Sequence, residues 1–208
     1  MLITGISEFD RKRSKIFIDE EFAFVLYKGE LKLYGIKEQE EISEAAYNEI
    51  VGGVLVKRAR LRAANLLAKR EYTEHQIRCK LKEGGYPLIC IDTAIEFMKE
   101  YHYLDDERYA ISYLASRVER KSRKQLSMEL MNRGIDKTLI DTLFGEAECS
   151  RETEAKAVRS LLKKKKFCGL DASYEEKQKM SAYLYRKGFS TDIIQNEVNS
   201  CQFDGEGS

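Results

Sequence analysis

Apolar positions along the chain follow one pattern three times, each time around a glycine: Gly85, Gly134 and Gly188. Every copy has apolar residues eight and four positions before the glycine and one, six and ten positions after it. The residues are Ile77, Leu81, Tyr86, Ile91 and Ile95, then Leu126, Leu130, Ile135, Ile140 and Phe144, then Met180, Leu184, Phe189, Ile194 and Val198. Such spacing predicts a helix, a turn that ends at glycine, and another helix.

The three glycines are separated by 49 residues (85 to 134) and 54 residues (134 to 188). A fixed unit at such intervals is typical of a helical repeat array. We therefore expect a mainly α-helical chain of three tandem three-helix units, with an extended surface rather than the single deep pocket of an enzyme.

Helix-start signals support this division. Thr73 to Gln76 and Ser122 to Gln125 are capping-box patterns at the same distance ahead of the first apolar position of their copies, and Ser173 to Glu176 begins about one turn earlier. For the third helices, Asp136 and Ser190 are good N-caps, and Pro87 fits as a first-turn residue. The first helix of the first unit should run from about Val54 to Arg70, with Leu61, Ala64, Leu67 and Ala68 on one side.

The amino-terminal part differs from the rest. Residues 16–18 and 22–26 predict two short strands around a tight turn, and residues 2–6 a third strand. Glu20 suits a primed turn poorly, so the turn type stays open. A short helix should span Lys28 to Tyr34 and end at Gly35, Ser43 should cap the next helix, and Gly52-Gly53 should break or bend it. The expected division is 1–52 (hairpin region and acidic linker helix), 53–104, 105–149 and 150–200 (three-helix units), and 201–208 (tail).

Composition agrees with long solvated helices: of 208 residues, 34% are charged and one is proline. The five cysteines, Cys79, Cys90, Cys149, Cys168 and Cys201, are scattered and form no CxxC pair, which favours free thiols in a reducing cytosol. No apolar stretch approaches about 18 residues, and the start does not look like a signal peptide. We expect a soluble cytoplasmic protein.

Catalytic motifs are missing from the sequence. It has no phosphate-binding GxxxxGK[ST], no GxSxG and no HExxH, and its two histidines, His75 and His102, have no clustered metal ligands around them. Adjacent carboxylates at Asp105 and Asp106 could suggest acid–base or metal chemistry, but neighbours at a helix start point in different directions. Capping and interaction with the helix dipole explain them more simply. We expect no enzymatic activity, no cofactor and no metal.

Basic residues are the main candidate for function, because they recur in all three units. Any one cluster could be a merely solvated helix face, but stacked units would align the charges into a stripe suited to phosphates or to an acidic groove. The candidate binding residues are Lys57, Arg58, Arg62, Arg70, Arg117, Arg120, Lys121, Arg123, Lys124, Lys163 and Lys164.

The segment Tyr103 to Ala110, followed by Tyr113 and Arg117, together with the strands at 16–18 and 22–25, resembles the RecX family of regulators of the RecA recombinase. The family signature L-D-D-x-R-[FY]-A matches at every position. Its residues, expected to be mainly structural, are Leu104, Asp105, Asp106, Arg108, Tyr109 and Ala110, with Tyr113 following. The resemblance implies tandem three-helix units in an elongated, curved monomer that lodges in the groove of the RecA–DNA filament. It also implies inhibition of RecA ATPase and strand exchange, and so an effect on recombinational repair and the SOS response. The insertion at Lys163 to Ser173 and the tail depart from the pattern.

Two hypotheses remain. The chain is either a non-enzymatic modulator of the RecA filament or a helical repeat protein that binds single- or double-stranded DNA directly, and neither involves a membrane. The sequence shows no aromatic stacking platform among the basic residues, which weakens a role as a single-strand specialist.

Overall fold

A computed structural model describes residues 1–146 and 151–201 of the chain. It contains two compact units, Met1–Asp105 and Asp106–Ser208. The predicted tail, apart from Cys201, and Cys149 lie outside the described residues. The other four cysteines are free thiols.

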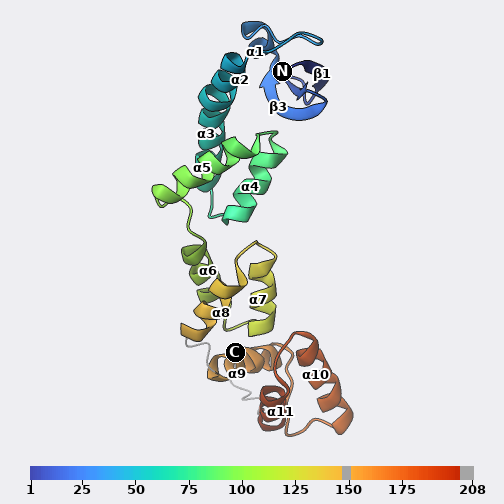
Figure 1. The fold of residues 1–208 in the computed structure, drawn as a ribbon. Coiled ribbons are helices and arrows are strands. Elements are labelled where there is room, and N and C mark those ends of the chain that lie inside the picture. The colour runs from blue at the N-terminus through green and yellow to red at the C-terminus, as the bar shows by residue number, and fades with distance from the viewer. Residues whose placement is uncertain (147–150, 202–208) are drawn as a thin grey trace. The chain divides into compact units, whose positions relative to one another are not determined.

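The first unit begins with a three-stranded antiparallel sheet (Figure 1). The strands are β1 (Ile3–Glu8), β2 (Arg13–Ile18) and β3 (Glu21–Tyr27), in the order β1-β2-β3. The predicted hairpin and third strand are confirmed. Asp19 and Glu20 between β2 and β3 have φ of 50° and 70°, the backbone of a type I′ turn. Thr4 Oγ1 accepts a hydrogen bond from the Glu20 amide at 2.9 Å, a tertiary contact that helps hold this unfavourable residue in the turn.

Helices of the first unit follow the sheet. They are α1 (Lys28–Leu33), α2 (Glu44–Asn48), the π-helical segment η1 (Glu49–Leu55), α3 (Val56–Leu67), α4 (Glu74–Glu83) and α5 (Leu88–Glu100). Ser43 caps α2 as predicted, with its hydroxyl accepting from the Ala46 amide at 3.2 Å. Gly52-Gly53, expected to break or bend the helix, does not break it: the helix continues through both glycines as a wider π turn.

Of the residues expected on one side of α3, Ala64 and Leu67 are half-buried against the core, whereas Leu61 and Ala68 are exposed. Leu61 is 63% exposed, whereas Ala59, Ala63 and Leu66 are buried. These positions, four and three residues apart, form a stripe of their own, and α3 packs against α5. Leu61 instead lines a hollow.

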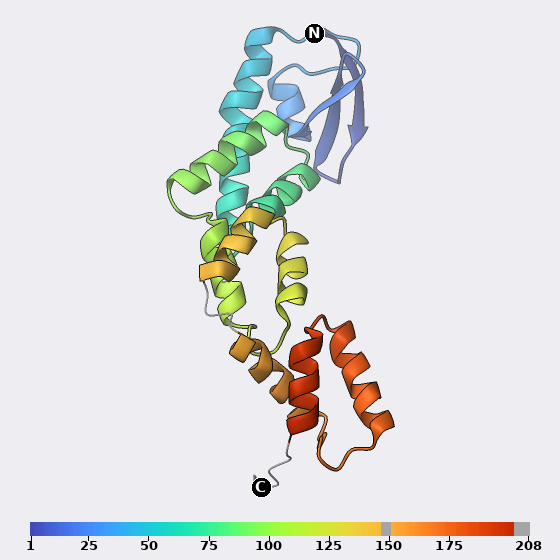
Figure 2. The same cartoon turned by 60° about the horizontal axis from the view of Figure 1, so that its bottom comes forward.

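One hydrophobic core joins the sheet to the helices of this unit. It includes Ile16 and Phe24 from the strands and Ile77, Ile91 and Met98 from α4 and α5, all at most 2% exposed. Figures 1 and 2 show the sheet beside the helix that runs from α2 to α3. The amino-terminal region and the first three-helix unit therefore share their packing.

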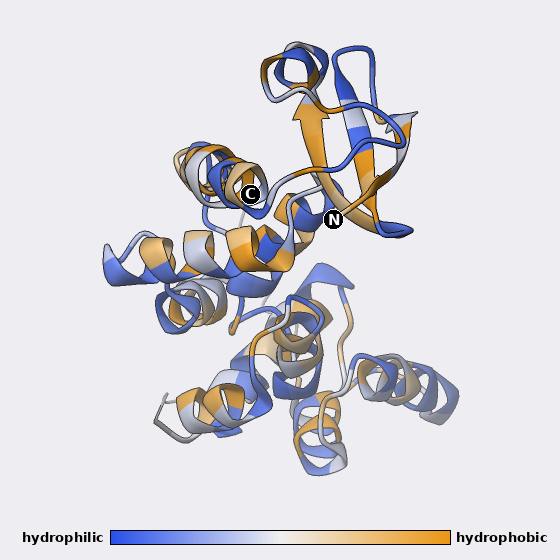
Figure 3. Cartoon of the chain, turned by 45° about the horizontal axis from the view of Figure 1, so that its top comes forward, coloured by the Kyte–Doolittle hydropathy of each residue, from blue (hydrophilic) through white to orange (hydrophobic). Residues whose placement is uncertain are grey.

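The second unit is entirely helical in its described part and has two cores. Its helices are α6 (Asp106–Ala115), α7 (Arg123–Met131), α8 (Lys137–Glu146), α9 (Arg151–Lys164), α10 (Tyr174–Arg186) and α11 (Thr191–Ser200). One core lies among α6, α7 and α8 and the other among α9, α10 and α11. The helices carry hydrophobic and hydrophilic residues side by side (Figure 3), as amphipathic helices do. The predicted mainly helical fold with three-helix units is confirmed.

The repeated glycines end α4, α7 and α10 in the left-handed conformation, with φ of 78°, 82° and 87° at Gly85, Gly134 and Gly188. After each, the amide of the next residue donates to a carbonyl five residues back; for Ile135 and Leu130 the distance is 3.1 Å. This is a Schellman motif, in which the two bonded residues also make a hydrophobic contact. Of the fifteen repeated apolar positions, all are buried except Tyr86 and Met180, which are half-buried.

The predicted hydroxyl caps of α4, α7 and α10 are confirmed, whereas Ser190 occupies the N-cap position of α11 without a capping hydrogen bond from its side chain. The hydroxyls of Thr73, Ser122 and Ser173 accept from backbone amides three residues later, at 3.1–3.3 Å. Asp136 accepts from the Thr138 amide at 2.8 Å, next to the start of α8. Pro87 takes the cap position immediately before α5.

Candidate basic interface

Basic candidates of the first unit lie on and after α3. Lys57, Arg62 and Arg70 are exposed. Arg58 is half-buried, forms an ion pair with Glu30, and its guanidinium carbon lies 4.7 Å from the centroid of the Tyr27 ring. Arg58 is thus held against the end of the sheet, whereas the Arg70 guanidinium carbon lies 4.3 Å from the centroid of the Tyr72 ring.

In the second unit, Arg117 and Lys121 surround a buried tyrosine. The Arg117 guanidinium carbon lies 4.0 Å from the centroid of the Tyr113 ring, and the Tyr113 hydroxyl donates to Glu129. Lys121 Nζ lies 2.6 Å from both oxygens of Glu129. Burial alone would raise the pKa of Glu129, but hydrogen bonds from Lys121, Tyr113 and Gln125 outweigh this and hold the pKa at about 2. Lys121 is therefore paired with a carboxylate, whereas Arg117 contacts the Tyr113 ring, the Tyr113 carbonyl and the Ser116 hydroxyl.

Arg120, Arg123 and Lys124 are exposed at the start of α7 and just before it. The Arg123 amide donates to Glu154 Oε1 at 2.9 Å, and its guanidinium carbon lies 4.9 Å from the Phe144 ring centroid. Within residues 1–146 and 151–201, Arg120 makes no such contact, so it is a cation available for binding.

Two three-helix segments of the second unit meet at Ser122, which is completely buried. Its hydroxyl donates to the Lys187 carbonyl at 2.6 Å while it caps α7. A Cβ added at Gly188 would lie 2.9 Å from Ser122 Oγ, so glycine permits this close approach. The basic residues at the start of α7 are therefore anchored next to the turn that ends α10.

Lys163 and Lys164 are exposed in the last turn of α9. Cations there interact favourably with the helix dipole. The neighbouring Lys166 has φ of 52° and occupies the position that glycine has in the repeated turns. Both lysines thus have a local structural role in addition to their charge.

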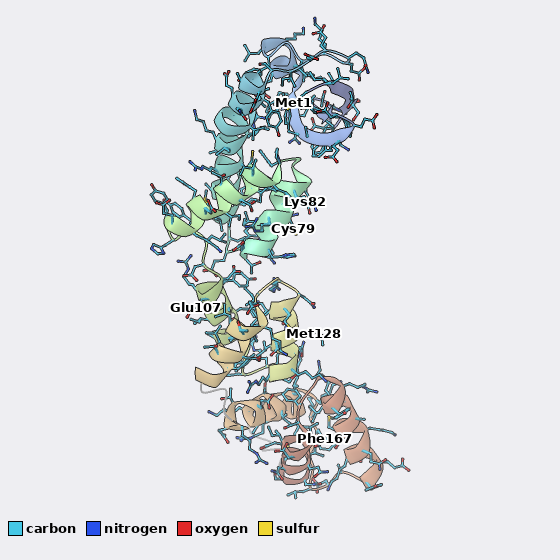
Figure 4. All side chains as sticks on the ribbon, in the orientation of Figure 1. Met1, Cys79, Lys82, Glu107, Met128 and Phe167 are labelled. Atoms are coloured by element: carbon cyan, nitrogen blue, oxygen red, sulfur yellow. The ribbon has the colours of Figure 1, made fainter. Side chains whose placement is uncertain are left out.

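Of the seven signature residues from Leu104 to Ala110, two are buried, and two aromatic rings in this part of the chain stack on each other. Leu104 and Ala110 are buried, and the rings of Tyr109 and Tyr113 stack with centroids 6.2 Å apart. Asp106 is the first residue of α6. The exposed residues of the signature are Glu107, which Figure 4 shows on α6, and Arg108.

Metal and membrane sites find no support. Among residues 1–146 and 151–201, no three His, Cys, Asp or Glu side chains come together as metal ligands. His75 Nε2 lies 3.6 Å from Cys79 Sγ on exposed α4, and His102, with φ of 55°, ends α5. Over the same residues, no helix combines the length and the hydropathy of a membrane span.

Aromatic rings accompany the arginines more closely than the sequence suggested. Rings of Tyr27, Tyr72, Tyr113 and Phe144 lie 4.0–4.9 Å from guanidinium carbons. Tyr72 and Tyr113 come from the same stretch of chain as Arg70 and Arg117, whereas Tyr27 and Phe144 come from a strand and a helix other than those of Arg58 and Arg123. Lys12 and Arg13, which line a hollow with Arg58 and Arg62, were missed. The basic run at residues 11–15 was the signal for them.

Comparisons with known proteins agree on one family. Models of the first, second and third three-helix domains of RecX match residues 59–98, 105–143 and 152–196. The regulatory protein RecX of Caldanaerobacter subterraneus subsp. tengcongensis is 33% identical over 96% of this chain and 99% of its own length. That of Clostridium botulinum (strain Eklund 17B / Type B) is 28% identical, over 91% of this chain and 90% of its own.

Solved structures share the fold. A crystal structure of regulatory protein RecX covers 93% of this chain and 97% of its own, with a TM-score of 0.62 and 22% identity. RecX from Lactobacillus salivarius covers 68% of this chain and 93% of its own, with a TM-score of 0.56 and 22% identity.

Proposed function

Because the chain belongs to the RecX family, we propose that it regulates the RecA recombinase by binding the RecA–DNA filament and inhibiting RecA ATPase and strand exchange. The observation that carries the proposal is the match to regulatory protein RecX along nearly the whole chain. In this role the protein would act without chemical turnover of its own, as a cytoplasmic monomer, and would modulate recombinational repair and the SOS response.

We propose that the three-helix units at 53–104, 105–149 and 150–200 share the contacts to the filament. Exposed cations in each unit support this: Arg62 and Arg70 in the first, Arg120 in the second, and Lys163 in the third. A filament presents the same surface repeatedly, so weak contacts on one chain add through effective concentration. Lys121 would contribute mainly by pairing with Glu129 of α7, which also accepts a hydrogen bond from Tyr113 of α6.

The test is RecA's DNA-dependent ATPase rate, titrated with this protein at fixed salt. Arg70→Glu and Arg120→Glu each reverse an exposed charge and should weaken inhibition modestly. Combined, they should weaken it much more than either alone, because two anchors of one tethered contact are lost. Lys137→Glu, an equally large charge change at an exposed position outside the candidate set, is the matched control.

Circular dichroism checks that each variant keeps its helices, since exposed substitutions usually change stability by less than about 0.5 kcal/mol. A double variant that inhibits as well as the unaltered protein would remove the basic residues from the proposal. No effect of the unaltered protein on ATPase or strand exchange would overturn regulation of RecA itself.

Direct nucleic-acid binding is the second candidate, and the pairing of guanidinium groups with aromatic rings favours it. Salt separates the two. Phosphate binding should fall steeply between about 50 and 200 mM salt, whereas a complex that also buries protein surface should keep its affinity longer.

A further inference from the structure

A hollow of about 640 Å³ lies within the first unit, where the sheet meets the helices. Its walls come from the β1–β2 turn and β2, from α3, and from the end of α4 with the turn that follows. This volume is in the range of ligand-binding sites. Five cationic side chains line it: Lys12, Arg13, Arg58, Arg62 and Lys80.

The hollow has more positive than negative charge. The lining carboxylates are Asp10, held by Arg13 at 2.7 Å, and Glu83, held by Lys80 at 2.8 Å. Lys12 and Arg62 are exposed, and among the described residues no carboxylate lies within 4.0 Å of either charged group. These two cations are available to an anionic ligand, whereas Arg13, Arg58 and Lys80 are each paired with a carboxylate.

Guanidinium groups from two elements converge at Tyr86, which follows the turn that ends α4. Burial raises the pKa of the Tyr86 hydroxyl, and the charges of Arg58, Arg13 and Arg62 act in the opposite direction. Arg13 comes from the sheet and the other two from α3. The site therefore exists only when the sheet is packed on the helices.

Aromatic rings lie among these charges. Phe9, Tyr27 and Tyr86 line the hollow, and Phe9 and Tyr27 each have a guanidinium carbon 4.7 Å from the ring centroid. Cations that follow a phosphate backbone, with rings that can take a base, are the combination found in single-strand binding sites. A duplex keeps its bases stacked inside and would leave the rings unused, and an acidic peptide would need only the charges.

We propose that this hollow binds a segment of single-stranded nucleic acid, with phosphates at Lys12 and Arg62 and a base against the ring of Phe9 or Tyr86. This proposal rests on the second candidate function, direct nucleic-acid binding, and names a site for it that requires no RecA. Part of the site comes from the sheet region, namely Phe9, Lys12 and Arg13. These residues lie outside the segments that match the three-helix domain models.

The experiment measures fluorescence anisotropy of a short labelled oligothymidylate with the full chain, in the absence of RecA. The Lys12→Glu, Arg62→Glu double variant should bind about tenfold or more weakly, and the slope of log affinity against log salt should fall by about one for each lost contact. Lys32→Glu, an exposed residue of α1 in the same unit that does not line the hollow, is the matched control and should bind normally.

A ring substitution separates stacking from charge. Phe9→Leu should weaken oligothymidylate binding without changing its salt slope, because it removes a ring and no charge. Circular dichroism and hydrogen exchange verify that the sheet remains folded in each variant.

Labelled polyglutamate and a duplex of equal length are the competing probes. Equal or tighter binding of polyglutamate, lost in the double variant, would overturn the proposal in favour of an acidic protein partner. Three other results would also overturn the proposal. They are tighter binding of the duplex than of oligothymidylate, oligothymidylate binding that the double variant retains, and no oligothymidylate binding at all. ATPase inhibition is measured separately, so failure here leaves the regulation of RecA standing on its own test.

Discussion

Replacing Gly85 by alanine should destabilise the first unit far more than the same substitution at Gly35. Both glycines lie in this unit and both have positive φ, 78° at Gly85 and 63° at Gly35. They differ in their surroundings. A Cβ at Gly85 would lie 2.2 Å from Val25 Cγ2 of the sheet, whereas a Cβ at Gly35 would meet nothing within 4 Å.

The magnitude follows from two costs. Alanine in the left-handed conformation costs about 1–2 kcal/mol, and both variants incur it. At Gly85 the methyl group must also displace Val25, which is 4% exposed on a packed strand. Overpacking of this kind costs about 1–3 kcal/mol. The lower flexibility of the unfolded alanine variants stabilises both about equally and cancels in the comparison. Gly85→Ala should therefore exceed Gly35→Ala by about 1–3 kcal/mol.

Hydrogen exchange followed by mass spectrometry is the suitable assay, because each unit can be measured separately. Peptides that cover α4 and α5 report the opening free energy of the first unit, and peptides from α7 serve as an internal reference. Both variants should leave the α7 peptides unchanged. Equal destabilisation by the two variants would refute the reasoning, because it would mean that the sheet does not press on the turn. In that case the hollow beside Tyr86 would also lose its wall.

Three further predictions concern the second unit and the signature. The Glu129 pKa is lowered to about 2 from its ordinary 4.5, so its contribution to stability is present above pH 4.5 and is lost as the pH falls towards 2. Thermal melts of Glu129→Gln over this range should show a weaker pH dependence than those of the unaltered protein. At pH 7 the variant should lose about 1 kcal/mol of folding free energy, because solvent screens part of the interaction. A pH profile equal to that of the unaltered protein would contradict this. Ser122→Ala removes the cap of α7 and leaves the Lys187 carbonyl without its donor. Urea denaturation should therefore show a loss of about 1–3 kcal/mol in folding free energy. An unchanged midpoint would argue against a stabilising contact between Ser122 and the turn after α10. Asp105→Ala or Asp106→Ala should lower thermal stability by about 0.5–2 kcal/mol in at least one case, and normal melting with lost RecA inhibition would make the pair a contact site.

Local signals predicted most of the helices correctly. Each Schellman turn depends on a glycine and on two apolar residues, such as Leu130 and Ile135, whose spacing is visible in the sequence. Capping hydroxyls such as Thr73 act within three residues of their partners. Helix ends of this kind need no information from elsewhere in the chain. The π-helical course through Gly52 and Gly53 escaped prediction, because surrounding packing outweighed the low helix propensity of glycine there.

The sequence by itself determined the three helical repeats, their glycine turns and their caps, because these depend on contacts between residues close together along the chain. Only the tertiary structure decided which charges are available. Lys121 is paired with Glu129 eight residues later, and Arg58 with Glu30 twenty-eight residues earlier, while Arg62 remains exposed. The tertiary structure also decided that basic and aromatic side chains from the sheet and from α3 line one hollow. The physical reason is that charge pairing and concave sites arise between residues distant in sequence, and their positions follow from how whole helices and strands pack.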